Sequence, residues 1–222
     1  MASIINYQDF RLSRINEPQY KHLWWLLFFP IYWLRYPLIE QLNPADYYHP
    51  IHCPLDALIP FSEWFIIPYM LWMVTIVLFA IYTLLYDIDS FRRYMKLLTV
   101  TMLISTVIFL IFPSCQNLRP AVLPRDNLLS KCVALLYSTD TNTNVFPSEH
   151  AIGAIAVWIA AVNTKSLRRP IIIGAITILE VLICLSTVFL KQHSLLDVLA
   201  AAPICAFGYL VCYKSDRSMV KK

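Results

Sequence analysis

One histidine of this sequence stands at a spacing from an aspartate that suits catalysis. His193 precedes Asp197 by four residues, which places the two side chains on one face of a helix. The carboxylate can then accept a hydrogen bond from one ring nitrogen, so that the other nitrogen keeps its lone pair as a nucleophile or base. Taken alone, this spacing also fits an interfacial histidine bonded to its neighbour, so its interpretation depends on the other segments.

A second segment, residues 146–150, has the pattern of a helix start. Ser148 is the expected N-cap, and a proline precedes it. Free backbone N–H groups at a helix start bind anions, and His150 in the first turn is placed to act as an acid toward a bound phosphate ester. The plainer alternative is an ordinary cap beside a chance histidine.

Two cations accompany these segments. Arg119 carries a planar, permanently charged fork that suits phosphate oxygens, although a loop arginine also meets lipid headgroups. Lys191 lies two residues before His193. It either supplies a charge to a bound phosphate or extends its ammonium to the membrane interface, and the sequence leaves both readings open.

The composition predicts a membrane protein that carries these residues on apolar helices. The chain is 59% hydrophobic and 14% charged, whereas a soluble domain has roughly 25% charged residues. A helix needs about 20 apolar residues to cross a bilayer. We therefore expect an all-α integral membrane bundle of about six helices, forming a single membrane domain over residues 1–222. The expected spans are roughly 23–39, 61–86, 95–112, 149–164, 170–190 and 194–213.

The distribution of basic residues predicts the orientation. Thirteen of the 18 Lys and Arg residues fall in the tails and in two short connections that share one side of the membrane: Arg11, Arg14, Lys21, Arg92, Arg93, Lys96, Lys165, Arg168, Arg169, Lys214, Arg217, Lys221 and Lys222. The positive-inside rule places that side, both termini and the tail of residues 1–22 in the cytoplasm. The loops 41–60 and 113–148 then lie outside, so the candidate residues meet at the extracytoplasmic face.

Several residues have structural interpretations. Glu180, in the middle of a span, should face protein in a structural or channel role. Arg35 is expected to extend from the first span to the interface. A lid or headgroup-recognition loop explains His49, His52 and Cys53 better than a metal site does. A disulfide among Cys53, Cys115 and Cys132 is conceivable, but the sequence cannot pair them.

Other function classes are disfavoured. Three glycines in the chain leave no glycine-rich nucleotide loop, and no basic stripe for nucleic acid is present. The basic groups of the short loops and tails instead suit contact with anionic membrane lipids.

Together the segments resemble the type 2 phosphatidic acid phosphatase superfamily, the membrane relatives of vanadium haloperoxidases. That family's pattern is K-x6-R-P, then P-S-G-H, then S-R-x5-H-x3-D. The matching residues are Arg119 and Pro120, then Pro147, Ser148 and His150, then Ser186, His193 and Asp197. The resemblance covers roughly residues 95–213, the motif-bearing core, and its six-span plan agrees with the hydropathy.

Three positions depart from the family pattern. Phe112 stands where the first motif has lysine, Glu149 where the second has glycine, and Thr187 where the third has arginine. Two cationic phosphate ligands are therefore missing, and Glu149 adds a negative charge unless it points away or pairs with Lys191 or Arg125. Reduced cation ligation also resembles the sphingolipid-synthase branch, which moves a phosphate-linked headgroup between lipids.

The resemblance implies a lipid phosphatase of the plasma membrane that needs no metal or cofactor. His193 would attack phosphorus while Asp197 orients it, and His150 would protonate the leaving group and then activate water. Arg119, Ser148 and Lys191 would hold the phosphoryl oxygens of a phosphatidate-type lipid, phosphatidylglycerophosphate or a polyprenyl diphosphate. A lipid phosphotransferase and a non-enzymatic relative that binds lipid phosphate remain the alternatives.

Overall fold

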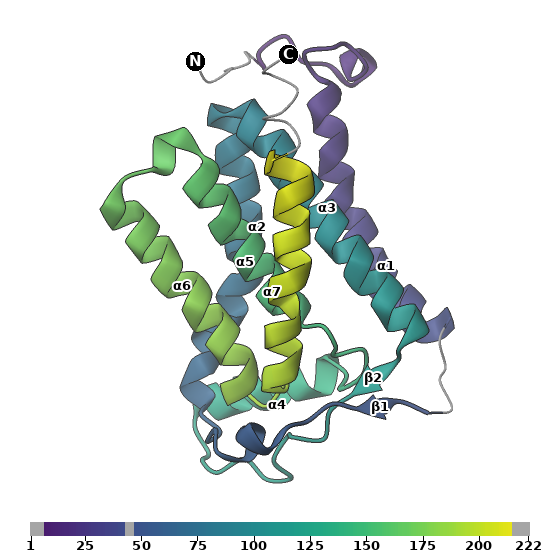
Figure 1. Ribbon diagram of the computed structural model, residues 1–222, viewed down its shortest axis with the longest axis vertical. Helices are drawn as coiled ribbons and strands as arrows, with labels where there is room; N and C mark the ends of the chain where they lie inside the picture. Colours follow the sequence, from purple (N-terminus) through teal and green to yellow (C-terminus); the bar gives the residue numbers. More distant parts are fainter. Residues whose placement is uncertain (1–6, 43–46, 215–222) are drawn as a thin grey trace.

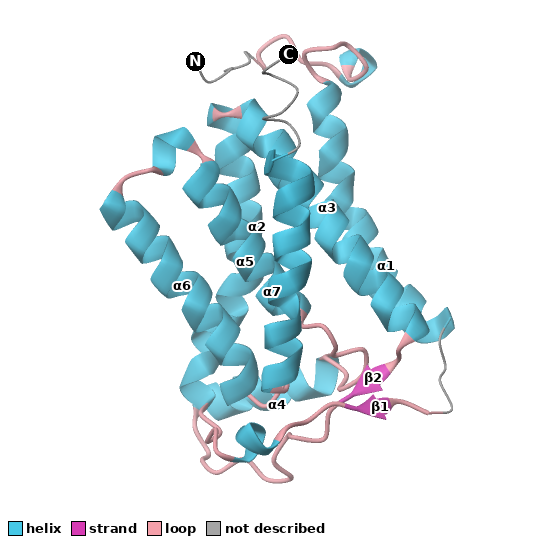
Figure 2. Cartoon of the chain, viewed as in Figure 1, coloured by secondary structure: helices cyan, strands magenta, loops and turns pink. Residues whose placement is uncertain are grey.

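A computed structural model describes residues 7–42 and 47–214, and these residues form an all-α bundle with one short pair of strands (Figure 2). The helices are α1 (Phe28–Leu42), α2 (Ile66–Tyr86), α3 (Ile88–Ile111), α4 (Leu128–Thr139), α5 (Glu149–Asn163), α6 (Pro170–Phe189) and α7 (Leu195–Tyr209). The strands are β1 (His49–Pro50) and β2 (Ser114–Cys115). Short 3₁₀ turns cover Leu12–Arg14, Lys21–Leu27, Pro54–Ala57, Glu63–Phe65 and Lys165–Leu167, and a π turn covers Leu210–Lys214.

The long helices run side by side, and the polar connections gather at one end of the bundle. Helix α5 packs against α2, α3, α6 and α7 and is therefore the central element. Helix α4 and the parallel pair β1–β2 lie below the long helices in Figure 1, while the 3₁₀ turns before α1 and the end of α7 lie at the opposite end. Residues 47–62, the loop after α3 and the α6–α7 turn thus share one end.

Among the described residues, four helical segments are long and apolar enough to cross a membrane, namely Glu63–Tyr86, Ile88–Ile111, Pro170–Phe189 and Leu195–Lys214. Helices α1 and α5 have 15 residues each, so their crossing, and with it the count of six spans and the cytoplasmic placement of the termini, stays a prediction. Helix α2 exposes an apolar stripe at three- to four-residue intervals, as a lipid-facing surface requires. Its members are Ile67, Met70, Val74, Leu78, Ile81 and Leu85.

Two sequence expectations need correction. The segment 113–148, expected to be a loop, contains α4, which Asn127 caps by accepting a hydrogen bond from the Ser130 N–H. This helix is short and amphipathic, and a search for membrane spans does not detect such a segment. Helix α3 begins at Ile88 instead of residue 95, because Asp87 caps it and its first turns carry charged residues that lower the hydropathy.

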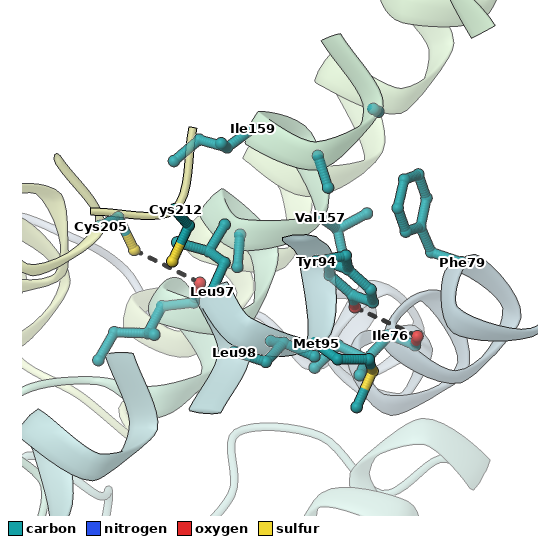
Figure 3. Close-up of a cluster of buried hydrophobic side chains, with 14 of the residues drawn as sticks. Ile76, Phe79, Tyr94, Met95, Leu97, Leu98, Val157, Ile159, Cys205 and Cys212 are labelled. Carbon is teal, nitrogen blue, oxygen red and sulfur yellow. Dashed lines mark hydrogen bonds between the residues drawn. The ribbon is translucent and has the colours of Figure 1, made fainter. Parts of the chain in front are cut away.

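The core between the helices is made of apolar side chains with few polar atoms (Figure 3). The Tyr94 hydroxyl donates to the Ile76 carbonyl at 3.2 Å, and Cys205 Sγ lies 3.6 Å from the Ile152 carbonyl. Gly153 of α5 allows α2 to approach closely, since a Cβ there would lie 2.4 Å from Trp72 Nε1. This close packing holds the start of α5 against α2.

Candidate functional site

The turn between α6 and α7 fixes the backbone of His193. Helix α6 ends in a Schellman motif, in which the Gln192 N–H bonds the Thr187 carbonyl at 2.9 Å and the Lys191 N–H bonds the Val188 carbonyl at 3.1 Å. Lys191 occupies the left-handed position that glycine usually takes, with φ 55°. The His193 N–H bonds the same Thr187 carbonyl at 3.1 Å, so the histidine is tied to the end of α6.

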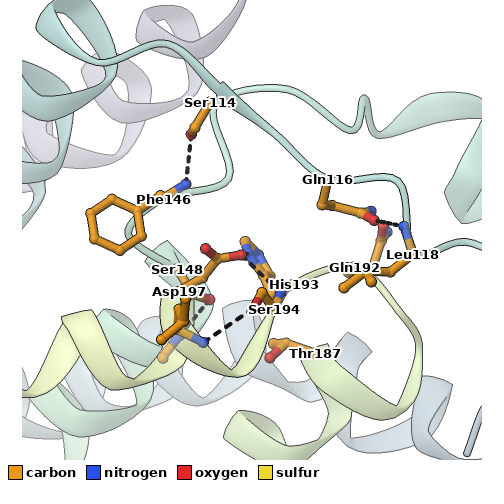
Figure 4. A network of polar contacts seen from close by, with 12 residues as sticks. Ser114, Gln116, Leu118, Phe146, Ser148, Thr187, Gln192, His193, Ser194 and Asp197 are labelled. Atoms are coloured by element: carbon orange, nitrogen blue, oxygen red, sulfur yellow. Dashed lines mark hydrogen bonds and ion pairs between the residues drawn. The ribbon is translucent and has the colours of Figure 1, made fainter. Parts of the chain in front are cut away.

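Asp197 contacts His193 from the first turn of α7 (Figure 4). Its Oδ2 lies 3.3 Å from His193 Nδ1 and accepts the Ser194 N–H at 2.9 Å, while Ser194 caps the helix. Asp197 is fully buried, and its carbonyl accepts the Ser148 N–H at 3.0 Å. The structure therefore brings together His193 and Asp197, as their spacing predicts, and joins them to the start of α5.

His150 stands in the first turn of α5 between two aromatic rings. Its ring centroid lies 4.4 Å from that of Tyr69 and 4.2 Å from that of Trp72. The centroids of His150 and His193 are 5.7 Å apart. Both histidines line one cavity of about 590 Å³. One phosphate ester in this cavity can therefore reach a nucleophile and a proton donor together.

The cavity is largely aromatic, with polar groups contributed by the segment between α4 and α5. The residues that line it are Tyr32, Trp33, Tyr36, Pro37, Tyr69, Met70, Trp72, Met73, Phe109, Leu136, Thr139, Asp140, Thr141, Thr143, Asn144, Val145, Glu149, His150, Gln192 and His193. Ser148 is fully buried and is not among them, because its Oγ accepts the Ala151 N–H as the helix cap. It positions the start of α5 and does not face the cavity.

Arg119 does not line the cavity itself but contacts Gln192, which does. Its guanidinium donates to the Tyr137 carbonyl at 3.2 Å, the Thr141 carbonyl at 3.0 Å and Gln192 Oε1 at 2.5 Å. The guanidinium carbon also lies 4.7 Å from the centroid of the Tyr137 ring. Gln192 and Thr141 line the cavity, so Arg119 forms a positive edge behind its wall.

Lys191 does not face the histidines. Its Nζ donates to the Asp56 carbonyl at 2.7 Å and the Ile59 carbonyl at 2.5 Å, and it lines a different cavity with His52 and Asn117. Burial lowers the pKa of this ammonium. Arg119 and Lys191 were predicted as phosphate ligands. Arg119 lies next to the histidine cavity, whereas Lys191 lies outside it.

Asp56 is a buried residue that sequence reasoning missed. Its Oδ2 accepts from the Ser194 hydroxyl at 2.7 Å and from the Cys53 N–H at 2.7 Å, and its Oδ1 accepts the Leu195 N–H at 2.8 Å. Burial opposes the charge, but these hydrogen bonds outweigh it and lower the pKa of Asp56. With the two bonds from Lys191, residues 53–59 hold both flanks of His193, and we call them the clasp. In the sequence, the residues around Asp56 have only the pattern of a capped turn, and nothing in that pattern indicates a contact with Ser194.

An ion pair that the sequence did not predict lies in the cavity wall. Arg35 donates to Glu149 Oε2 at 2.6 Å, which also accepts from the Tyr32 hydroxyl at 2.8 Å, and Ser105 donates to Glu149 Oε1 at 2.7 Å. The expected interfacial placement of Arg35 was therefore wrong, as was the pairing of Glu149 with Lys191 or Arg125. Glu149 pairs with Arg35 because α1 packs on α3 beside the start of α5.

The remaining candidates have structural contacts. Phe112 stacks on His49 with centroids 4.4 Å apart, and Thr187 Oγ1 donates to the Cys184 carbonyl, so no charge replaces the missing family cations at these two positions. Within residues 7–42 and 47–214, no group of three histidine, cysteine or acidic side chains is arranged to hold a metal ion. Cys53, Cys115 and Cys132, all in the described part, form no disulfide with one another.

Comparison with known families identifies a match that covers most of the site. The model of the PAP2 superfamily matches residues 93–218, which is more than half of the chain. The matched region contains both histidines, Asp197 and Arg119, and it spans nearly all of α3 together with α4 to α7. No curated protein and no solved structure matches the chain.

Proposed function

The chain belongs to the PAP2 superfamily, and on this premise we propose that it is an integral membrane phosphatase that acts on a lipid phosphate ester through a phosphohistidine. One observation carries the proposal, namely that His193, held by Asp197, shares a single cavity with His150. The proposed substrates are phosphatidate-type lipids, phosphatidylglycerophosphate and polyprenyl diphosphates.

In the first step, the free Nε2 of His193 attacks phosphorus. Asp197 accepts the hydrogen bond from Nδ1, which fixes the tautomer and stabilises the positive charge that develops on the ring. The bond between phosphorus and the ester oxygen breaks, and His150 gives that oxygen its proton. Arg119 lies behind Gln192 and offsets the negative charge of the phosphoryl group.

In the second step, His150 acts as a base. It takes a proton from water, the water oxygen attacks phosphorus, and the bond between phosphorus and His193 breaks. The packing of His150 between Tyr69 and Trp72 keeps its ring oriented through both steps.

The purified protein in detergent micelles tests this mechanism with a panel of lipid phosphate monoesters and diphosphates. His193→Ala should abolish free phosphate release and any acid-labile phosphoenzyme. His150→Ala should lower turnover roughly 10²–10⁴-fold, and a substrate with a good leaving group should then accumulate phosphoenzyme. Asp89→Ala, in an exposed ion pair at the opposite end of the bundle, is the control and should behave as wild type. Phosphate trapped on His150 in the His193→Ala variant would refute the assigned roles.

Metal independence is tested on the same preparation. Activity should survive chelation by EDTA and fall with vanadate, which mimics five-coordinate phosphorus. Full loss of activity on chelation, with recovery on adding zinc or magnesium, would contradict the proposal.

We also propose that the site faces the extracytoplasmic side of the plasma membrane. The basic connections support this orientation, since they lie at the end of the bundle opposite the clasp and α4. Accessibility labelling of single introduced cysteines should modify residues 113–148 from outside and residues 165–169 from inside. Labelling of both segments from one side would exclude this arrangement.

A second candidate is transfer of a phosphate-linked headgroup to a lipid alcohol. The neutral residues Phe112 and Thr187 at two family cation positions favour it, together with the carboxylate of Glu149 in the wall. Adding acceptor alcohols separates the two reactions, since a hydrolase releases free phosphate whereas a transferase forms a new lipid. Neither product from a folded protein would support a non-enzymatic lipid-phosphate-binding relative.

A further inference from the structure

Asn144 is a buried polar residue of the histidine cavity that the mechanism does not use. It is 4% exposed, and neither its Oδ1 nor its Nδ2 has a hydrogen-bond partner among the described residues. It lines the same cavity as His150 and His193. Because an unpaired buried amide is costly, this arrangement indicates that a molecule bound in the cavity satisfies it.

The backbone holds Asn144 in this position. Its φ is 52°, in the left-handed region, and its N–H donates to the Ser114 carbonyl at 2.5 Å. The Ser114 hydroxyl accepts the Phe146 N–H at 3.0 Å (Figure 4), so strand β2 fixes the chain on both sides of residue 145. The amide therefore stands on a preformed loop that leads directly into the helix start that carries His150.

The two free atoms of Asn144 restrict what can bind there. The amide has an acceptor, Oδ1, and a donor, Nδ2, on one rigid group. An ionised phosphoryl oxygen only accepts hydrogen bonds and would leave Oδ1 unpaired, whereas an ammonium group only donates and would leave Nδ2 unpaired. A water molecule donates and accepts, so it satisfies both atoms.

The carboxylates of the cavity are less suited to hold this water. Asp140 Oδ2 already accepts from the Tyr69 hydroxyl at 3.1 Å, and Glu149 is paired with Arg35 at 2.6 Å. An ionised carboxylate also lacks a donor. Asn144 instead offers a free donor and a free acceptor in a fixed orientation, which is what the positioning of a reactant requires.

We propose that Asn144 holds the water that hydrolyses the phosphohistidine, with Oδ1 accepting one hydrogen of that water and Nδ2 donating to its oxygen. This inference rests on the proposed phosphohistidine at His193. It assigns Asn144 to the second step of the reaction alone, and it favours water over a lipid alcohol as the acceptor.

The step balances with water as the sole added reactant. The water oxygen forms a bond to phosphorus, and the bond between phosphorus and His193 Nε2 breaks, with its electron pair returning to the ring. One hydrogen of the water passes to His150 as a proton, while the other stays on the oxygen and faces Asn144 Oδ1. An alcohol has a single hydroxyl hydrogen, which His150 must take, so an alcohol leaves Oδ1 unpaired.

Rapid-quench kinetics in detergent micelles test the proposal. The substrate is the lipid of the phosphate-ester panel that the wild-type protein cleaves fastest, with a radioactive label in the phosphoryl group that is transferred. Three quantities are followed, namely the lipid product of the first turnover, the label on the enzyme, and the label in free phosphate or, with ethanol added, in ethyl phosphate. The wild-type phosphoenzyme should form free phosphate in excess over ethyl phosphate, beyond the molar ratio of water to ethanol.

The variant Asn144→Gly keeps the left-handed backbone, which glycine adopts without steric cost, and removes both amide atoms. Decay of its phosphoenzyme in water should slow roughly 10- to 100-fold, because the attacking water loses two hydrogen bonds. Ethanol has one fewer contact to lose, so the ratio of ethyl phosphate to free phosphate should rise about tenfold. First-turnover release of the lipid product, and with it kcat/KM, should stay at the wild-type value, because both report only the formation of the phosphohistidine.

A second asparagine provides the control. Asn163 lies at the far end of α5, where its Nδ2 donates to the Ile159 carbonyl at 2.8 Å. Asn163→Ala removes this amide and should change none of the three quantities.

Several outcomes would overturn the inference. Equal slowing of the water and ethanol reactions in Asn144→Gly would do so, as would decay of its phosphoenzyme at the wild-type rate. A fall in kcat/KM without accumulated phosphoenzyme would place Asn144 on the first step and reject the assignment. An excess of ethyl phosphate from the wild-type protein, beyond the molar ratio of ethanol to water, would reject it whether or not the variant folds.

The same data separate this inference from the proposed function. In each of these outcomes the wild-type protein still cleaves the lipid and forms a phosphoenzyme, so the proposed attack by His193 stands. A folded wild-type protein that cleaves no ester of the panel would instead remove the proposed function, and the role of Asn144 with it.

Discussion

Replacing Asp56 by alanine should reveal how much of the site depends on the clasp. The carboxylate accepts three hydrogen bonds of 2.7, 2.7 and 2.8 Å from Ser194, Cys53 and Leu195, and Asp56 is 3% exposed. A hydrogen bond to a charged group contributes about 1.5–3 kcal/mol, and bonds that share one acceptor group are not additive. We therefore expect Asp56→Ala to lower the free energy of unfolding by about 3–5 kcal/mol.

The same change should affect catalysis, because the clasp holds the backbone that carries His193. A displacement of about 1 Å of a reacting group can cost about 10²-fold in rate. Asp56→Asn keeps one oxygen, which can still accept from the Ser194 hydroxyl and the Cys53 N–H, the two donors that share Oδ2. It should therefore fall between wild type and alanine in both stability and kcat. Denaturant unfolding in detergent and steady-state kinetics on the same preparation measure the two effects.

A matched aspartate serves as control. Asp89 lies at the other end of the bundle in an exposed pair with Arg92 at 3.8 Å, and such pairs contribute about 0–1 kcal/mol. Asp89→Ala should leave turnover unchanged. A loss below about 1 kcal/mol for Asp56→Ala, or full activity in that variant, would refute the role assigned to the clasp.

The pH dependence gives an independent check on Asp56. Its folded-state pKa is lowered, so its contribution to stability is fully present above the unfolded-state value of about 3.9 and is lost as the pH falls through the folded-state pKa. The Asp56→Asn variant lacks this titration. The free energies of unfolding of the wild-type protein and the Asp56→Asn variant should therefore converge as the pH is lowered below about 4. A stability difference that does not change with pH would contradict the role assigned to Asp56.

Two further substitutions test the packing around the cavity. Gly153→Ala should displace the Trp72 indole, which should lower the free energy of unfolding by about 1–3 kcal/mol and also lower kcat/KM. Gly174→Ala, with open space around it, is the control and should not destabilise the protein. Equal unfolding midpoints for the two variants would exclude the close contact between Gly153 and Trp72. Glu149→Gln leaves the Arg35 charge unpaired and should cost about 3–5 kcal/mol, part of which Arg35→Met should restore in the double variant. Additive losses in that double-mutant cycle would show that the pair does not couple.

The sequence alone determined the features that depend on neighbours along the chain. Hydropathy located α2, α6 and α7 within a few residues, because a buried or lipid-facing stripe is a local property of one helix. The helix cap at Ser148 was predictable since capping involves residues two or three apart. The spacing of His193 and Asp197 set their contact for the same reason.

Tertiary structure decided which distant charges meet. Arg35 and Glu149 lie 114 residues apart, and Asp56 reaches Ser194 across 138 residues, so no periodicity links either pair. Lys191 stands two residues from His193, yet its left-handed backbone and the clasp carbonyls direct its ammonium into another cavity. A charge in a low-dielectric interior takes the partner that chain packing places within reach, and packing is a property of the whole bundle.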